Sequence, residues 1–153
     1  MNVRKATPND LEGIVKLGNK MLDFHCTFDP YYCIYREYDD INDFYKDELC
    51  KKDRFYIVAE NDDCELVGFA SASITSIPNT PTPVIGSLIA SFVSEDYRRQ
   101  GIGTEFYKKR MDWLKSHNVK HVEMSVDAHN KTALELWKKF GFKNYQYKLK
   151  LDL

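Results

Sequence analysis

A short run of residues, Arg98-Arg99-Gln100-Gly101-Ile102-Gly103-Thr104, combines the residue types that could bind phosphate. Its two glycines allow a sharp turn and let a ligand come close to the backbone. A helix that starts at this point would offer free N–H groups to anionic oxygens, and the two arginines add positive charge. The run therefore indicates a phosphate or pyrophosphate site, although a tight strand-to-helix turn with solvated arginines would show the same short pattern.

Two common phosphate-binding motifs do not match this run. The P-loop has Lys and then Ser or Thr after its last glycine, whereas Thr104 and Glu105 stand here. The dinucleotide fingerprint would have glycine in place of Phe106, and Glu123 is a poor ribose ligand because it falls in the middle of a predicted strand. A nucleotide or dinucleotide binder therefore stays as the weaker alternative.

Apolar periodicity predicts the elements that position this turn. A Thr7 cap with Pro8 at the first helical position starts the first helix, and Asn130 caps the last. Strands are predicted at 2–6, 55–60, 66–77, 84–93, 121–126 and 147–153, and helices at 8–25, 39–51, 102–118 and 131–140. The order βααβββαβαβ predicts an α/β (α+β) fold, in which a mixed sheet carries helices on its faces.

Length and composition limit the class of protein. The 153 residues, 43% hydrophobic and 29% charged, fit one domain over 1–153 and exclude a collagen-like, disordered or disulfide-rich chain. The uncharged run 66–92 is broken by polar residues, so no membrane span is predicted, and the charged N-terminus lacks a signal peptide's apolar segment. We expect a cytoplasmic protein with four reduced cysteines, no metal site and no nucleic-acid partner, because the cysteine spacing has no C-x-x-C pair and the C-terminal bases are spread over several elements.

The run 93–103, Val-Ser-Glu-Asp-Tyr-Arg-Arg-Gln-Gly-Ile-Gly, resembles the acetyl-CoA signature of the GNAT superfamily of N-acetyltransferases, in which R/Q-x-x-G-x-G/A follows the fourth strand. Three other segments agree: the hairpin 58–70, the helix start 130–133, and 133–142, which is similar to the family's A-x-x-x-Y-x-x-x-G-F ending. The resemblance covers nearly the whole chain in the right order. It implies a mostly antiparallel twisted sheet with helices on both faces, and acetyl-CoA as co-substrate.

The resemblance also implies roles for individual residues. The CoA pyrophosphate would be held by backbone amides of Arg98, Arg99, Gln100, Gly101, Ile102, Gly103 and Thr104. The pantetheine arm would pair with Ser91, Phe92 and Val93 as if it were another strand, and would contact Asn130. The backbone amide of Val93 would then lie near the thioester oxygen.

This sequence departs from the family pattern where protons are transferred. Trp137 stands where the family often has a tyrosine that protonates the leaving thiolate, and an indole N–H is only a neutral donor. The strand 84–93 contains no acid that could act as a base. Asp127, His129 and a water chain are compatible with that role, so no side-chain base is assigned.

The acceptor side is implied to come from the first two helices and the loop between them. Residues 23–48 contain eight acidic and two basic side chains, together with many aromatic rings. This composition favours a cationic primary amine, polyamine-like or of the lysine type, held by aromatic and acidic residues. The named candidates are Phe24, Phe28, Tyr31, Tyr32 and Asp39. A solvated acidic helix over an aromatic core would have the same composition.

The sequence thus predicts an enzyme that moves an acetyl group from acetyl-CoA to a primary amine of a small molecule, by direct attack in a ternary complex. The alternative is a non-catalytic acetyl-CoA sensor or interaction module of the same fold. The sequence leaves the oligomeric state open, a homodimer included.

Overall fold

The computed structural model describes residues 1–31, 33 and 41–151. Its strands are β1 (Asn2–Lys5), β2 (Arg54–Glu60), β3 (Leu66–Ser76), β4 (Val84–Val93) and β5 (His121–Met124). Its helices are α1 (Leu11–Cys26), α2 (Ile41–Cys50), α3 (Ile102–Ser116) and α4 (Lys131–Lys139), with the short 3₁₀ turns η1 (Pro8–Asp10) and η3 (Glu95–Tyr97).

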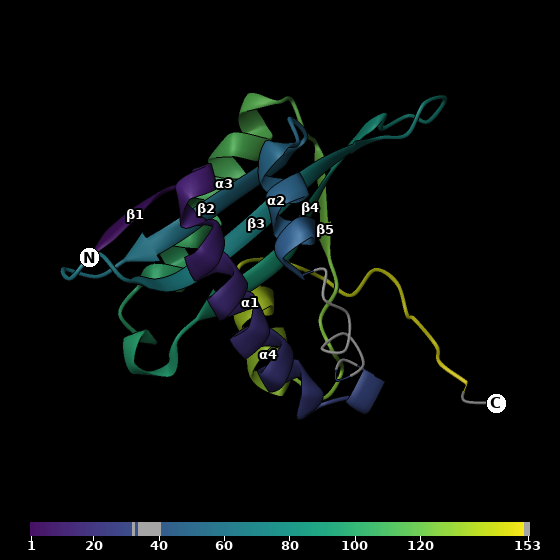
Figure 1. Ribbon diagram of the computed structural model, residues 1–153. Helices are drawn as coiled ribbons and strands as arrows, with labels where there is room; N and C mark the ends of the chain where they lie inside the picture. Colours follow the sequence, from purple (N-terminus) through teal and green to yellow (C-terminus); the bar gives the residue numbers. More distant parts are fainter. Residues whose placement is uncertain (32, 34–40, 152–153) are drawn as a thin grey trace.

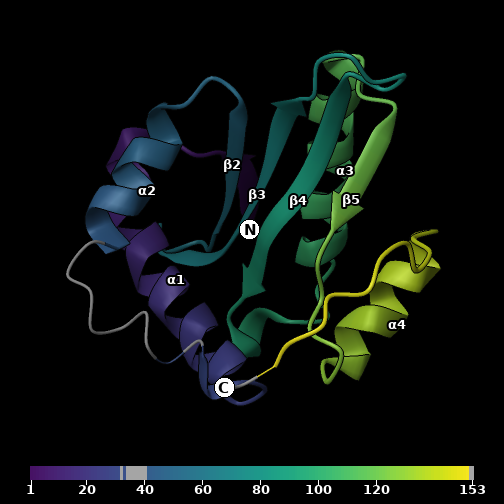
Figure 2. The same ribbon diagram turned by 90° about the vertical axis from the view of Figure 1, so that its right-hand side faces the viewer.

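The strands form one sheet in the order β1-β2-β3-β4-β5 (Figure 1). Neighbouring strands are antiparallel except for β4 and β5, which run parallel. Figure 2 shows α1 and α2 on one side of this sheet and α3 on the other. The predicted mixed, mostly antiparallel sheet with helices on both faces is confirmed.

Alternation along β2 separates the two layers of the core. Tyr56 and Val58 pack in the same cluster as Ile14 and Leu17 of α1. Ile57 and Ala59 instead share a cluster with Ile102 and Phe106 of α3. The sheet is therefore covered on both faces, as the long uncharged run 66–92 requires.

The pairing between β4 and β5 is short. Only Ile85 to Leu88 have partners on β5, whereas Ser91 to Val93 pair with β3 alone. The β3–β4 register also shifts at Ser71, between Ala70 and Ala72. Such a bulge bends a strand and increases its twist, which accompanies the separation of β4 from β5.

The predicted last strand is wrong within the described residues. Tyr147, Leu149 and Leu151 lie in an extended segment without strand pairing, which runs away from the sheet in Figure 1, and their side chains are more than four fifths exposed. Alternating apolar residues form a strand only where another strand offers its edge, and β5 ends at Met124, two residues before the predicted end. No helix of the described residues combines the length and apolarity needed to cross a membrane.

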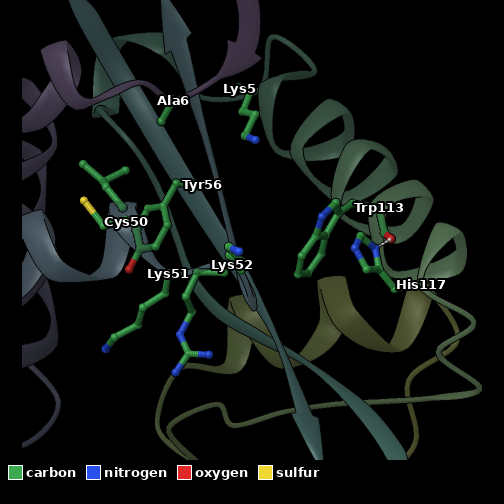
Figure 3. A pocket seen from close by; sticks show the side chains of 10 residues that line it. Lys5, Ala6, Cys50, Lys51, Lys52, Tyr56, Trp113 and His117 are labelled. Carbon is green, nitrogen blue, oxygen red and sulfur yellow. Dashed lines mark hydrogen bonds between the residues drawn. The ribbon is translucent and has the colours of Figure 1, made fainter.

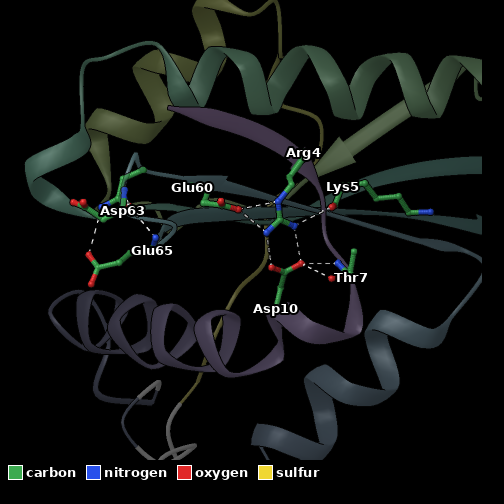
Figure 4. A network of polar contacts seen from close by, with 8 residues as sticks. Arg4, Lys5, Thr7, Asp10, Glu60, Asp63 and Glu65 are labelled. Atoms are coloured by element: carbon green, nitrogen blue, oxygen red, sulfur yellow. Dashed lines mark hydrogen bonds and ion pairs between the residues drawn. The ribbon is translucent and has the colours of Figure 1, made fainter.

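Arg4 joins the first strand, the first turn and β2 through one set of ion pairs (Figure 4). Its guanidinium contacts both carboxylate oxygens of Asp10 at 2.8 Å and Oε2 of Glu60 at 2.7 Å. The Asp10 carboxylate also accepts the Thr7 N–H at 2.7 Å, which completes the predicted cap. The hydrogen bond from Arg4 and burial act in opposite directions, and the former dominates, so the pKa of Asp10 is lowered to about 2.

We expect Asp10→Asn to lower the free energy of unfolding at pH 7 by roughly 1–2 kcal/mol, a value reduced because Arg4 is partly exposed. Because the folded-state pKa of Asp10 is depressed, this contribution is complete above pH 4 and is lost as the pH falls toward 2. Urea unfolding at several pH values would measure it. Asp63→Asn, an exposed turn residue, is the matched control, and an equal loss at pH 2.5 and pH 7 would contradict the assignment.

Candidate functional site

The turn from β4 into α3 exposes a row of backbone N–H groups. Arg99 and Gly101 have positive φ angles of 61° and 88°, and the turn between them leads into Ile102. The first hydrogen bond of α3 runs from Glu105 N–H to the Gly101 carbonyl at 3.0 Å. Within the described part of the chain, the N–H groups of residues 99–104 have no protein acceptor. Donors arranged in this way suit an anion, which is the use that the sequence predicts for this turn, and we call residues 99–104 the socket.

Both glycines of this turn border open space. A Cβ added at Gly101 or Gly103 would meet no atom within 4 Å. Gly101 is needed for its left-handed φ, which side chains rarely adopt. Gly103 has no such requirement, so the space that its missing side chain leaves is available to a ligand. This cradle fits a pyrophosphate that approaches the backbone closely.

Arg98 differs from the residues that follow it, because its backbone N–H and its side chain both have hydrogen-bond acceptors. Its N–H donates to the Glu95 carbonyl at 3.1 Å, and its side-chain Nε donates to the Val93 carbonyl at 3.0 Å. Its guanidinium carbon lies 5.6 Å from the ring centroid of Phe24 on α1. Arg98 thus orders the turn and contributes charge, whereas the free backbone donors begin at Arg99.

The end of β4 presents an open strand edge. Ser94 donates its N–H to the Val67 carbonyl at 2.8 Å, which makes this pair a hydrogen-bonded one. Hydrogen-bonded and non-bonded pairs alternate in an antiparallel ladder, so the N–H groups of Val93 and Ser91 point away from β3. Phe92 instead directs its side chain into the α1–α2 core. An extended ligand could therefore pair with this edge where β5 has ended.

α4 contributes two of the predicted residues. The Asn130 side chain accepts the Ala133 N–H at 3.1 Å, so the predicted cap is confirmed. Trp137 packs against Tyr107, Phe140 and Phe142 in the core cluster beneath β5, as an aromatic residue at helical spacing should.

The loop after β5 lies close to the end of α1. The Asp127 carboxylate accepts the His129 N–H at 2.8 Å and contacts its Nδ1 at 2.9 Å, and the His129 ring is exposed. Burial lowers the pKa of His25, and the Asp127 carboxylate partly opposes that shift. His25, for which the sequence predicts no role in this site, thus lies near Asp127, one of the residues compatible with a base.

Some of the predicted acceptor residues gather near the turn. Phe24 and Phe28 form an edge-to-face pair with 5.1 Å between centroids, and Tyr31 is exposed. A cavity of about 340 Å³ beside Phe24 is lined by Lys20, Phe92, Ser94, Glu95, Asp96 and Arg98. Tyr32 and Asp39 lie outside the described residues. Glu48 is not an acceptor-side acid, because it is buried in ion pairs with Lys51 and Arg54.

A second cavity, of about 410 Å³, lies at the other end of α3 (Figure 3). Trp113 and His117 of α3 face it, together with Lys5, Lys51 and Lys52. The socket lies at the start of α3, whereas Trp113 and His117 lie at its end. This cavity is therefore separate from the candidate site.

Arg110 is a buried residue that the sequence reasoning missed. Its side chain has no exposed surface, and its guanidinium donates to the carbonyls of Ala90 and Ser71 beneath the bulge. The sequence does contain a signal for its burial, because Arg110 follows Ile102 and Phe106 and precedes Leu114 at i, i+4 spacing. All four residues are buried in the structure. A charged residue within an apolar stripe of this kind marks a buried charge.

Comparison with known proteins shows the family. Residues 20–142 match the Acetyltransferase (GNAT) family, and the chain belongs to that family, as its motifs indicate. An uncharacterized N-acetyltransferase of Methanocaldococcus jannaschii is 30% identical over 142 residues, which cover 92% of this chain and 59% of the relative. An N-alpha-acetyltransferase of Sulfurisphaera tokodaii is 31% identical over 147 residues, covering 92% of this chain and 79% of the relative. The chain thus spans less than two thirds of the first relative's length.

Solved structures share the fold. A predicted acetyltransferase with acetyl-CoA from Clostridium acetobutylicum superposes with a TM-score of 0.78 at 18% identity, over 99% of this chain and 95% of that one. An aminoglycoside antibiotic 6'-N-acetyltransferase from Acinetobacter baumannii gives 0.74 at 18% identity, over 99% and 97%. The family membership indicates an acetyl-CoA-dependent acyltransferase.

We expect Gly103→Leu to weaken CoA binding by at least about tenfold, because its side chain would fill the cradle and cover the free N–H groups. Gly103→Ala should have a much smaller effect. Both variants should keep or raise the melting temperature, since alanine and leucine favour a helix over glycine. Calorimetric titration with CoA, combined with thermal unfolding, tests this directly. A leucine variant with unchanged CoA affinity would mean that the pyrophosphate binds elsewhere.

Proposed function

We propose that this protein transfers the acetyl group of acetyl-CoA to a primary amine by direct attack within a ternary complex. The observation that carries the proposal is the continuity of free backbone donors: those of residues 99–104 in the turn, and those of Val93 and Ser91 along the adjoining strand edge. The first set suits a pyrophosphate, and the second suits the two amides of a pantetheine arm. The family's solved neighbour from Clostridium acetobutylicum is described with acetyl-CoA, which supports the same ligand here.

The role of the strand edge follows from its geometry. A pantetheine arm that pairs with β4 lies in the place that β5 has left, with its reactive end toward the bulge. An arm that starts at the turn meets Val93 first and Ser91 next, so its thioester lies beyond both residues; a backbone N–H there, rather than that of Val93, would stabilise the negative charge that grows on the thioester oxygen during attack. A fixed donor of this kind is worth about 2.7–4 kcal/mol in comparable sites.

Thioester chemistry reduces the need for acid catalysis. The amine nitrogen forms the C–N bond, the C–S bond breaks, and the electron pair leaves on sulfur as a thiolate. A thiol of pKa about 8.5 is a good leaving group, so Trp137 in place of a tyrosine slows the reaction without preventing it. The proton lost by the amine passes to water or to a side chain that we leave unassigned.

The acceptor that we propose is a cationic primary amine. With the buried Glu48 left out, acidic side chains still outnumber basic ones seven to two over residues 23–48, and the Phe24–Phe28 pair supplies ring faces beside the turn. Arg98 lies over the Phe24 ring with its guanidinium carbon 5.6 Å from the centroid, so at least one cation is already held against this aromatic pair. The names of the Sulfurisphaera tokodaii relative and the Acinetobacter baumannii neighbour also denote amine acceptors.

We expect thiol release from acetyl-CoA above the hydrolysis rate when spermidine or a lysine-type amine is added. The kcat/KM for these amines should exceed that for the amine of glutamate, and KM should rise with salt, because screening weakens attraction by exposed carboxylates. A peptide with a free N-terminus completes the panel. Gly103→Leu is the control, because thiol release that this variant retains does not depend on coenzyme binding at the socket.

Two outcomes would contradict different parts of the proposal. Faster turnover of glutamate than of spermidine would remove the cationic acceptor and leave the acetyltransferase. CoA binding without amine-dependent release from any member of the panel would favour a non-catalytic sensor or interaction module.

A further inference from the structure

We infer that the buried guanidinium of Arg110 supplies the positive charge that stabilises the CoA thiolate as it leaves, in place of a proton from an acid. The inference rests on the proposed function and concerns one step of it. Arg110 lies on α3, outside the coenzyme socket. Two observations support the role: the position of its guanidinium below β4, and the lack of an anionic partner among the described residues.

Arg110 is a buried cation with neutral partners. Its Nε donates to the Phe106 carbonyl at 3.2 Å, and its Nη1 donates to the carbonyls of Ala90 at 3.0 Å and Ser71 at 3.3 Å. Its Nη2 is buried and has no hydrogen-bond partner. No carboxylate of the described residues lies within ion-pair distance of this guanidinium. A charge in this setting is costly to keep unless an anion near it compensates.

The charge is retained at working pH. Burial lowers the pKa of Arg110 to about 10, and it is the one cause of the shift. The side chain is therefore still a cation between pH 7 and 9. An uncompensated cation in a dry environment acts over a longer range than the same charge in water.

The guanidinium lies beneath the reactive end of the proposed cleft. Its strongest contact is to Ala90, the residue before Ser91, at the bulge where β4 has already separated from β5. Its central carbon also lies 5.9 Å from the ring centroid of Trp137. By resemblance to the family, Trp137 occupies the position from which a tyrosine reaches the leaving sulfur. Arg110 therefore contacts the strand that would align the thioester and lies close to the helix residue that occupies the tyrosine position.

Few other groups near Arg110 could stabilise the leaving thiolate. β3 and β4, which lie over Arg110, have no ionisable side chain. The ionisable residues of α3 itself and of the elements around it are Glu105, Tyr107, Lys108, Lys109, Asp112 and Lys115 on α3, Arg4 and Lys5 on β1, Arg54, Tyr56 and Glu60 on β2, His121 and Glu123 on β5, and Lys131, Glu135, Lys138 and Lys139 on α4. Of these, only Tyr56 is buried, and it faces the α1–α2 layer instead.

The step balances without a proton donor. The lone pair of the neutral amine forms the C–N bond, and the electron pair of the C–S bond leaves on sulfur. The amine proton goes to water, and the thiolate pairs electrostatically with the Arg110 cation until CoA dissociates. The same charge must then lower the pKa of the thiol in bound CoA, which gives a measurement that needs no acceptor.

The test compares CoA with desulfo-CoA, which lacks the sulfur. Thiolate absorbance of CoA bound to the wild-type protein should titrate at least about one pH unit below the value near 8.5 of a free thiol. Between pH 6.5 and 9, the affinity for CoA relative to desulfo-CoA should rise about tenfold. Arg110→Met should abolish both effects, and Arg110→Lys should keep most of them.

The matched control is Lys109→Met, which removes an equal charge from the adjacent, partly exposed position on α3. It should leave the thiol titration unchanged. A wild-type thiol that titrates at or above its free value overturns the inference, and this holds even if Arg110→Met does not fold. Equal titrations in wild type and a folded Arg110→Met also overturn it. Absence of binding by both CoA and desulfo-CoA would instead overturn the proposed function.

Discussion

The constraint on which the site depends is the early separation of β4 from β5. After Leu88 the two parallel strands no longer pair, so the last residues of β4 have one strand neighbour instead of two. Backbone N–H and C=O groups that face an empty edge need partners. In the proposed complex a peptide-like arm would supply them, and the turn that follows β4 would supply further donors. The cleft is therefore a missing piece of sheet rather than a cavity lined by side chains.

The bulge opposite Ser71 interrupts the pairing of β3 with β4, but backbone groups on both sides of it have partners. Ala90 donates its N–H to Ser71 Oγ at 3.3 Å, and both residues give their carbonyls to Arg110. The buried guanidinium thus satisfies backbone groups that the irregular register would leave without partners. In return, those carbonyls hold the guanidinium with one nitrogen unpaired. The bulge therefore both bends β4 away from β5 and places the Arg110 cation below the bend.

The sequence predicted the parts that local physical chemistry determines. Glycine spacing, a helix start and helical periodicity were sufficient for the socket, for the Thr7 and Asn130 caps and for most element boundaries. The last strand was wrong because its alternating pattern says nothing about whether a neighbouring edge is free. Arg98 was placed correctly in the turn, but its N–H proved to be used by Glu95. Arg110 was missed because a single charged residue is ordinarily read as exposed, even where its spacing places it in the core.

The coenzyme side and the acceptor side of the proposed cleft use different chemical groups. This difference explains why relatives of low sequence identity share the fold. The coenzyme side consists of backbone groups, whose positions depend on strand separation and a glycine turn rather than on side-chain identity. The proposed acceptor side consists instead of side chains from the end of α1, the turn after β4 and the loop after β5, where Phe24 meets Arg98 and His25 approaches Asp127. Side chains can be exchanged without loss of the sheet. At 18% identity, solved structures with different names can therefore share this fold.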